Sequence, residues 1–313
     1  MYPSNPDQIP PRRYSTETAF APSDPFAGAA QWTHMASLQK LRQASQMAEW
    51  FDYYFASRRD PRTSGWGGVQ DARIVFPLLI GYVYFVKIAG PRWMKDRKPF
   101  NLRWAVLTYN ALTVLANAYF TVKLFGLTYA SGHYSLFCQG INYSSPTETD
   151  VAILKLGWWY SFVRIGDFLD TIFFVLRKKN SQITFLHVAH HFLVVFSAWF
   201  YMNFGGDGQT ALGGCVNASI HVIMYSYYFL AALGPSMQKY LWWKRYLTKL
   251  QIAQFVGLML HMTITLFYDC GYPRRLALLA LSQGLLGLGL FINFYVQSYV
   301  KPRKSKAERK KTA

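Results

Sequence analysis

Seven long apolar blocks restrict what this chain can fold into. A helix needs about 20 predominantly apolar residues to cross the hydrocarbon core of a bilayer, and within lipid each segment must satisfy its own backbone hydrogen bonds. We therefore predict an all-α, polytopic membrane protein with seven transmembrane helices. The predicted spans, numbered one to seven in chain order, cover residues 74–90, 104–127, 152–176, 184–204, 210–233, 250–268 and 276–300.

The two ends of the chain differ from the transmembrane domain, which we assign to residues 74–300. Residues 1–73 have no early apolar core of the kind found in a cleavable signal peptide, and their Pro- and Ser-containing start favours partial disorder. Within them, residues 35–55 are compatible with an amphipathic helix at the membrane surface. Residues 301–313 form a basic tail.

Basic residues are concentrated after the odd-numbered spans, and this asymmetry predicts the orientation. Such loops face the cytosol, which places the N-terminus in the lumen and the C-terminus in the cytosol. The same asymmetry accounts for the net charge of +18, and without a nucleic-acid recognition motif we expect no nucleic-acid partner. The basic residues are Arg92, Lys95, Arg97, Lys98 and Arg103, then Arg177, Lys178 and Lys179, then Lys239, Lys244 and Arg245.

Short signals in the loops and the tail agree with this orientation. Asn142 begins a glycosylation sequon in the predicted lumenal loop after span two. Cys138 and Cys270 lie in lumenal loops, where an oxidising environment permits a disulfide between them; two free thiols are the alternative. Lys310 and Lys311, near the C-terminus, resemble a retrieval signal of endoplasmic-reticulum membrane proteins. We therefore expect a location in the endoplasmic reticulum membrane.

Polar residues inside the spans converge at one depth, in the half of the bilayer near the cytosol. Ionisable residues within a membrane are costly and usually functional. The three imidazoles of His187, His190 and His191 share a helical face because of their i, i+3, i+4 spacing. We interpret this level as a common cavity; interhelical packing contacts for the glutamines and an i, i+3 ion pair between Arg164 and Asp167 are the structural alternatives.

Four motifs lie on spans three to six. The motif on span four, H-x-x-H-H, is common to several membrane lipid enzymes. The four motifs together, in this order, are specific. Over residues 72–300 they resemble the ELO family, the condensing enzymes of very-long-chain fatty acid elongation. The family's K-x-x-E-x-x-D-T departs twice here, with Arg for Lys and Asp for Glu. The motif residues are Arg164, Asp167, Asp170 and Thr171; His187, His190 and His191; Asn217, His221, Met224 and Tyr225; and Thr248, Gln251, Gln254 and Phe255.

The resemblance implies an acyltransferase that condenses a long-chain acyl-CoA with malonyl-CoA, losing carbon dioxide, to give a 3-oxoacyl-CoA. We predict that His190 carries the acyl group as an acyl-imidazole, with His187 or His191 orienting it. His221 would stabilise an intermediate, and Asp170 would fix an imidazole tautomer. A mechanism in which histidine acts only as a base in one ternary complex stays open.

The predicted substrate contacts use the remaining motif residues and the basic loops. Amide side chains would donate hydrogen bonds to thioester or pantetheine oxygens, and lysines would meet the CoA phosphates. Spans two to seven would surround a closed-ended acyl tunnel, with span one outside it. The predicted substrate-binding residues are Asn217, Gln251, Gln254, Tyr225, Asp167, Arg164, Thr171, Lys178 and Lys249.

The expected partners are acyl-CoA, malonyl-CoA and the lipid bilayer, with no metal and no cofactor. A homodimer and association with other enzymes of the elongation cycle are further candidate arrangements. Two other functions stay open. The first is a metal-dependent membrane lipid enzyme. A di-iron centre typically needs more histidines than the seven in this chain, but a single ion bound by the histidine box is chemically reasonable. A seven-helix transporter could use the same polar groups as a proton relay.

Overall fold

The computed structural model describes residues 59–301 and, before them, residues 35, 38–39, 42–43, 45–46 and 53. Most of the predicted amphipathic helix and the whole tail with Lys310 and Lys311 lie outside the described residues. The described residues from 59 to 301 belong to one compact unit. Residues 59–71, which we assigned to the N-terminal segment, therefore pack with the predicted transmembrane domain.

The described residues are helical and contain no strand, as predicted. Six stretches are long and apolar enough to cross a membrane: Ala72–Met94, Arg103–Ala130, Phe185–Phe204, Thr210–Ala232, Lys244–Phe267 and Arg274–Val300. The helices of the described residues are η1 (Gly68–Gln70), α2 (Ala72–Tyr84), η2 (Phe85–Ala89), α3 (Gly90–Met94), α4 (Arg103–Phe125), η3 (Gly126–Ala130), α5 (Glu148–Gly166), α6 (Phe168–Leu176), η4 (Asn180–Gln182), α7 (Phe185–Phe204), α8 (Thr210–Ala232), η5 (Pro235–Tyr240), α9 (Lys244–Phe267), α10 (Arg274–Tyr295) and η6 (Val296–Val300).

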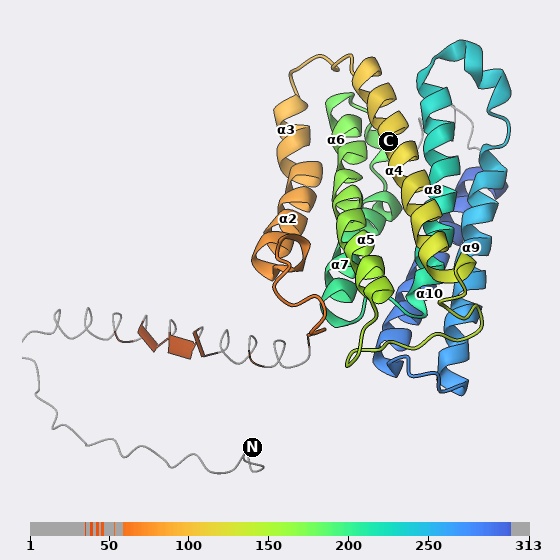
Figure 1. The fold of residues 1–313 in the computed structure, drawn as a ribbon. Coiled ribbons are helices and arrows are strands. Elements are labelled where there is room, and N and C mark those ends of the chain that lie inside the picture. Colours follow the sequence, from red (N-terminus) through yellow and green to blue (C-terminus); the bar gives the residue numbers. More distant parts are fainter. Residues whose placement is uncertain are drawn as a thin grey trace, which may run out of the picture. The chain divides into compact units, whose positions relative to one another are not determined.

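The predicted third span is not one helix but two. α5 ends at Gly166 and α6 begins at Phe168, so Asp167 lies between the two helices. Glycine has a low helix propensity, which favours a break at this point. α5 carries four charged residues, Glu148, Asp150, Lys155 and Arg164, and is not one of the six apolar stretches. It nevertheless runs alongside its neighbours α4 and α7 (Figure 1).

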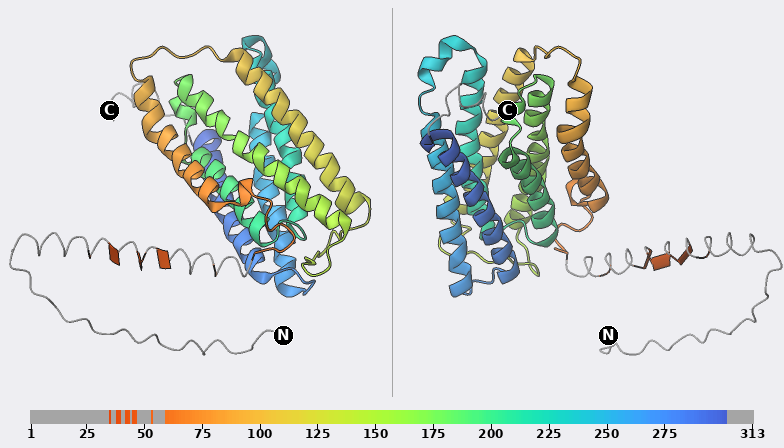
Figure 2. Two further views of the ribbon diagram at one scale, coloured as in Figure 1. Left: turned by 60° about the vertical axis from the view of Figure 1, so that its left-hand side comes forward. Right: turned by 180° about the vertical axis from the view of Figure 1, so that it is seen from behind.

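Six helices form a closed ring in the described part of the chain. Going round it, α4 contacts α5, α5 contacts α7, α7 contacts α10, α10 contacts α9, α9 contacts α8, and α8 returns to α4 (Figures 1 and 2). α2 packs against α7 from outside the ring. Val75 and Leu79 of α2 form a buried apolar cluster there with Val195 and Trp199 of α7.

The two ends of the ring differ, and we call them the disulfide end and the histidine end. Cys138 and Cys270 form a disulfide that ties the α4–α5 loop to the α9–α10 loop, with Cα atoms 5.9 Å apart. The backbones of these loops lie so close that a Cβ atom at Gly140 would collide with the carbonyl oxygen of Cys270. The histidine end is the opposite one, where α7 begins at Phe185.

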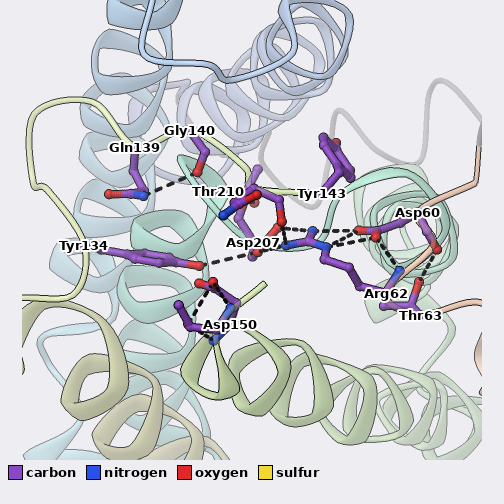
Figure 3. A network of polar contacts seen from close by, with 12 residues as sticks. Asp60, Arg62, Thr63, Tyr134, Gln139, Gly140, Tyr143, Asp150, Asp207 and Thr210 are labelled. Carbon is purple, nitrogen blue, oxygen red and sulfur yellow. Dashed lines mark hydrogen bonds and ion pairs between the residues drawn. The ribbon is translucent and has the colours of Figure 1, made fainter. Parts of the chain in front are cut away.

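A buried ion cluster anchors residues 59–71 at the disulfide end (Figure 3). The guanidinium of Arg62 lies between the carboxylates of Asp60 and Asp207, with N–O distances of 2.7 Å to each and all three side chains almost fully buried. It also lies over the ring of Tyr143, 5.0 Å from the centroid. Burial opposes the charge on Arg62, but the hydrogen bonds and ion pairs with both carboxylates outweigh it and raise its pKa.

Arg62→Met should therefore destabilise the protein strongly. The substitution leaves two buried carboxylates without their cation, which typically costs about 3–5 kcal/mol. The measurement is the thermal unfolding midpoint of purified protein in detergent. Arg73→Met is the matched control, because Arg73 pairs with Asp71 at an exposed site where ion pairs contribute little. Equal midpoints for the two variants would contradict this account.

Candidate functional site

A cavity of about 390 Å³ lies inside the ring. Its lining comes from α4, α5, α7, α8, α9 and α10 and, within the described residues, from neither α2 nor α3, as predicted for the first span. Most of its wall is apolar, including Leu193, Leu258 and Leu290. The polar residues that line it are Tyr160, Ser161, Arg164, His190, Ser197, Tyr201, Gln209, Thr210, Asn217, Gln254, His261 and Gln283.

Arg164 places a buried positive charge on the wall of this cavity. Its guanidinium donates to Asp167 at 3.1 Å, to Nδ1 of His221 at 2.8 Å and to Oδ1 of Asn117 at 2.9 Å. The guanidinium also lies over the ring of Tyr160, 4.5 Å from the centroid. Since arginine has no acceptor, Nδ1 of His221 must accept this hydrogen bond, so its proton is left to Nε2. The i, i+3 ion pair between Arg164 and Asp167, which was the structural alternative, is present and belongs to a larger network.

Of the three clustered histidines, His190 alone lines the cavity among the described residues. Thr184 caps the start of α7 and so places the histidine box in the first two turns. Adjacent residues project about 100° apart around a helix, so His191 turns away from His190 and is buried beside His187. The ring centroids of His187 and His191 are 4.3 Å apart, and those of His190 and His191 are 5.7 Å apart.

Asp170 contacts a tyrosine and not the predicted imidazole. Its Oδ2 accepts a 2.6 Å hydrogen bond from the hydroxyl of Tyr225, which lies 3.4 Å from the hydroxyl of Tyr109. The neighbouring Thr171 instead contacts His187, with Oγ1 2.9 Å from Nε2. The prediction that Asp170 fixes an imidazole directly was wrong, because one step along α6 turns the side chain toward α8 and not α7.

The remaining predicted residues divide between the cavity and other surroundings. Asn217 and Gln254 line the cavity. Gln251 lies outside this lining, with Nε2 3.5 Å from Sδ of Met224. Lys178 donates to the carbonyl oxygen of Lys95 at 3.0 Å, and Lys249 is exposed over the ring of Tyr246. Neither lysine belongs to the cavity lining.

Sequence reasoning missed several polar residues that the fold brings to the site. Asn117 of α4 is fully buried and accepts from both Arg164 and Tyr160, the latter at 2.6 Å. Gln209 and His261 line the cavity near the disulfide end, where Gln209 Nε2 donates to the carbonyl oxygen of His261 at 3.0 Å. The available signal was an amide or imidazole inside or beside an apolar block.

Two further predictions concern other side chains. Asn142 is exposed, and its side-chain amide donates to the carbonyl oxygen of Ser145 at 2.7 Å, so glycosylation there stays a prediction. For the single-ion alternative, residues 59–301 contain no group of three or more His, Cys, Asp or Glu side chains placed to hold a metal. His187 instead uses its Nε2 toward a threonine hydroxyl.

The fold and site define a polytopic helical membrane protein with a mostly apolar cavity and a histidine on its wall. The model of the ELO family, described as the GNS1/SUR4 family, matches residues 69–307. A very long chain fatty acid elongase of Aedes aegypti is 39% identical over 255 residues, which cover 82% of this chain and 71% of that protein. Human very long chain fatty acid elongase 4 is 41% identical over 248 residues, covering 79% of this chain and 78% of that protein. This chain belongs to the ELO family.

Tyr225→Phe should lower the thermal unfolding midpoint of the protein. Tyr225 is fully buried, and loss of its hydroxyl leaves the carboxylate of Asp170 without its 2.6 Å donor, which typically costs about 1–3 kcal/mol. Thermal unfolding in detergent measures the change. Tyr228→Phe on the same helix is the control, because Tyr228 is 39% exposed. If the unfolding midpoint of Tyr228→Phe were as low as that of Tyr225→Phe, the hydrogen bond to Asp170 would not be the cause.

Proposed function

We propose that this protein catalyses the condensing step of fatty acid elongation, in which an acyl-CoA and malonyl-CoA give a 3-oxoacyl-CoA, carbon dioxide and free CoA. The observation that carries the proposal is that His190 and Arg164 both lie on the wall of a mostly apolar cavity inside the ring. The cavity volume lies within the range of small-molecule sites. The family membership supports the same reaction class, because the relatives are named very long chain fatty acid elongases.

The setting of the proposal is the endoplasmic reticulum membrane, with the disulfide end in the lumen and the histidine end facing the cytosol. α5 and α6 would complete a seven-span bundle, with the N-terminus lumenal and the C-terminus cytosolic. Both CoA substrates would then reach the histidine end from the cytosol, while the acyl chain extends toward the disulfide end. The reaction as proposed balances without a metal or a cofactor.

The proposed chemistry uses a neutral imidazole as the nucleophile. His190 attacks the thioester carbonyl carbon through its unprotonated nitrogen, the carbon–sulfur bond breaks, and CoA leaves as a thiol with the proton of the other imidazole nitrogen. Malonyl-CoA then loses carbon dioxide, and the resulting enolate carbon attacks the acyl-imidazole to form the new carbon–carbon bond. The carbon–nitrogen bond breaks, and His190 takes up one proton from water to return to the neutral imidazole. The amides of Asn217 and Gln254 and the guanidinium of Arg164, which line the cavity together with His190, are the donors available to a developing oxyanion. His221 is not among the lining residues and contacts Arg164 through Nδ1.

His190→Ala should abolish a burst of CoA release. If His190 carries the acyl group, acyl-CoA alone should release free CoA, up to one per active site, before malonyl-CoA is added. A thiol-reactive dye in a rapid-mixing experiment measures the burst. His133→Gln is the control, since His133 lies in the α4–α5 loop and contacts Asp150. A normal burst in His190→Ala would assign the covalent role to another histidine, and no burst in the wild type would favour histidine as a base in one ternary complex.

The glycines of α8 offer a test of where the acyl chain lies. Gly213 lines the cavity one turn from the start of α8, and a Cβ atom there would meet only Leu258, at 3.8 Å. Gly213→Leu would fill this end of the cavity, so products should become shorter and activity with the longest accepted acyl-CoA should fall by roughly 10-fold or more. Product analysis by mass spectrometry over a series of acyl-CoA lengths measures this shift.

The matched control is Gly81→Leu on α2, where a Cβ atom meets nothing within 4 Å and the residue faces outward from the ring. This variant should keep the wild-type product lengths. An unchanged length profile in Gly213→Leu, with activity retained, would mean that the acyl chain lies elsewhere.

A further inference from the structure

A chain of hydrogen bonds links α2, which lies outside the ring, to the histidine box. The hydroxyl of Tyr82 lies 2.9 Å from Oγ1 of Thr171, and the same Oγ1 lies 2.9 Å from Nε2 of His187. Tyr82 is 6% exposed and Thr171 is fully buried. A residue of the first predicted span, to which we assigned no polar role, therefore reaches the site through one intervening side chain.

The ring of Tyr82 is held in place independently of its hydroxyl. It stacks on Phe168 with ring centroids 3.9 Å apart and an interplanar angle of 10°. Both rings belong to the buried apolar cluster between α2, α6 and α7, which includes Val188 of the histidine-box helix. Removing the hydroxyl alone would leave this packing intact, so the hydrogen bond can be tested separately from the core.

The direction of the hydrogen bonds follows from the donors available. A threonine hydroxyl has one proton to donate. Within the described residues the Tyr82 hydroxyl has Thr171 as its hydrogen-bond partner, so it is satisfied when it donates to Oγ1. Thr171 is then free to donate its own proton to Nε2 of His187. In this arrangement Nε2 accepts, and the neutral imidazole of His187 carries its proton on Nδ1.

We propose that Tyr82 is a positioning residue for the histidine box, which sets the tautomer and the ring orientation of His187 through Thr171. The ring of His187 lies beside that of His191, which in turn lies against His190. A loss of the Tyr82 hydroxyl frees Thr171 to rotate and allows His187 to change tautomer. The tautomer assignment stands on geometry alone, whereas its effect on turnover rests on the proposed condensing activity.

The kinetic test is Tyr82→Phe, assayed for 3-oxoacyl-CoA formation. We expect kcat to fall on the order of 10-fold, while KM stays unchanged and the unfolding midpoint falls less than in Tyr225→Phe, because the lost hydrogen bond joins two neutral groups. Tyr84→Phe, an exposed tyrosine two residues along α2, should match the wild type. In a Thr171→Val background Tyr82→Phe should have no further effect, whereas Thr171→Ser, which keeps the hydroxyl, should retain the dependence on Tyr82.

An unchanged kcat in Tyr82→Phe, equal losses in the wild-type and Thr171→Val backgrounds, or a loss that follows the unfolding midpoint would overturn the proposal. A second measurement does not depend on activity. In protein labelled with ¹⁵N-histidine, with the His187 signals assigned through their absence in His187→Gln, Nε2 should be unprotonated in the wild type and Tyr84→Phe and partly protonated in Tyr82→Phe.

A wild-type Nε2 that carries the proton would overturn the tautomer assignment even in an active enzyme. An inactive wild type with the expected tautomer would instead count against the condensing activity. It would leave the hydrogen bonds from Tyr82 through Thr171 to His187 in place.

Discussion

The structure depends on one buried cation, Arg164. A charge inside a membrane domain is costly unless it is paired and hydrogen bonded, and here the partners come from separate helices. Asn117 of α4, Asp167 at the α5–α6 junction and His221 of α8 each accept from the guanidinium. The helices must keep these positions for the guanidinium to keep its three partners, and the same arrangement places the cation on the wall of the cavity.

The polar groups at the two ends of the ring serve different purposes. At the disulfide end, the Arg62 cluster, the Cys138–Cys270 bridge and the Gln209–His261 contact hold loops together. Of these groups, Gln209 and His261 also line the cavity, so these contacts hold the end of the cavity near the disulfide in place. At the histidine end, the hydrogen bonds instead join neighbouring helices: Thr171 of α6 contacts His187 of α7, and Asp170 of α6 accepts from Tyr225 of α8.

The positions of the helices could be predicted from the sequence, whereas several contacts of the site could not. Six of the seven predicted spans correspond to apolar helical stretches, because hydrophobic length is a property of each segment alone. The break at Asp167 and the partner of Asp170 were missed, because a composition average does not register a local interruption, and one residue changes the direction of a side chain by about 100°. Asn117 and Tyr82 were missed because neither belongs to one of the four motifs.

By itself, the sequence determined that the chain is a helical membrane protein and that its cysteines can pair. These properties follow from hydrophobic length, helical rise and charge, which act along one segment at a time. Only the tertiary structure decided that His190 lines the cavity while His187 and His191 pack behind it, and that Tyr82 reaches the histidine box from outside the ring. The reason is that rotation of each helix about its axis is set by its neighbours in the ring, and no single segment encodes it.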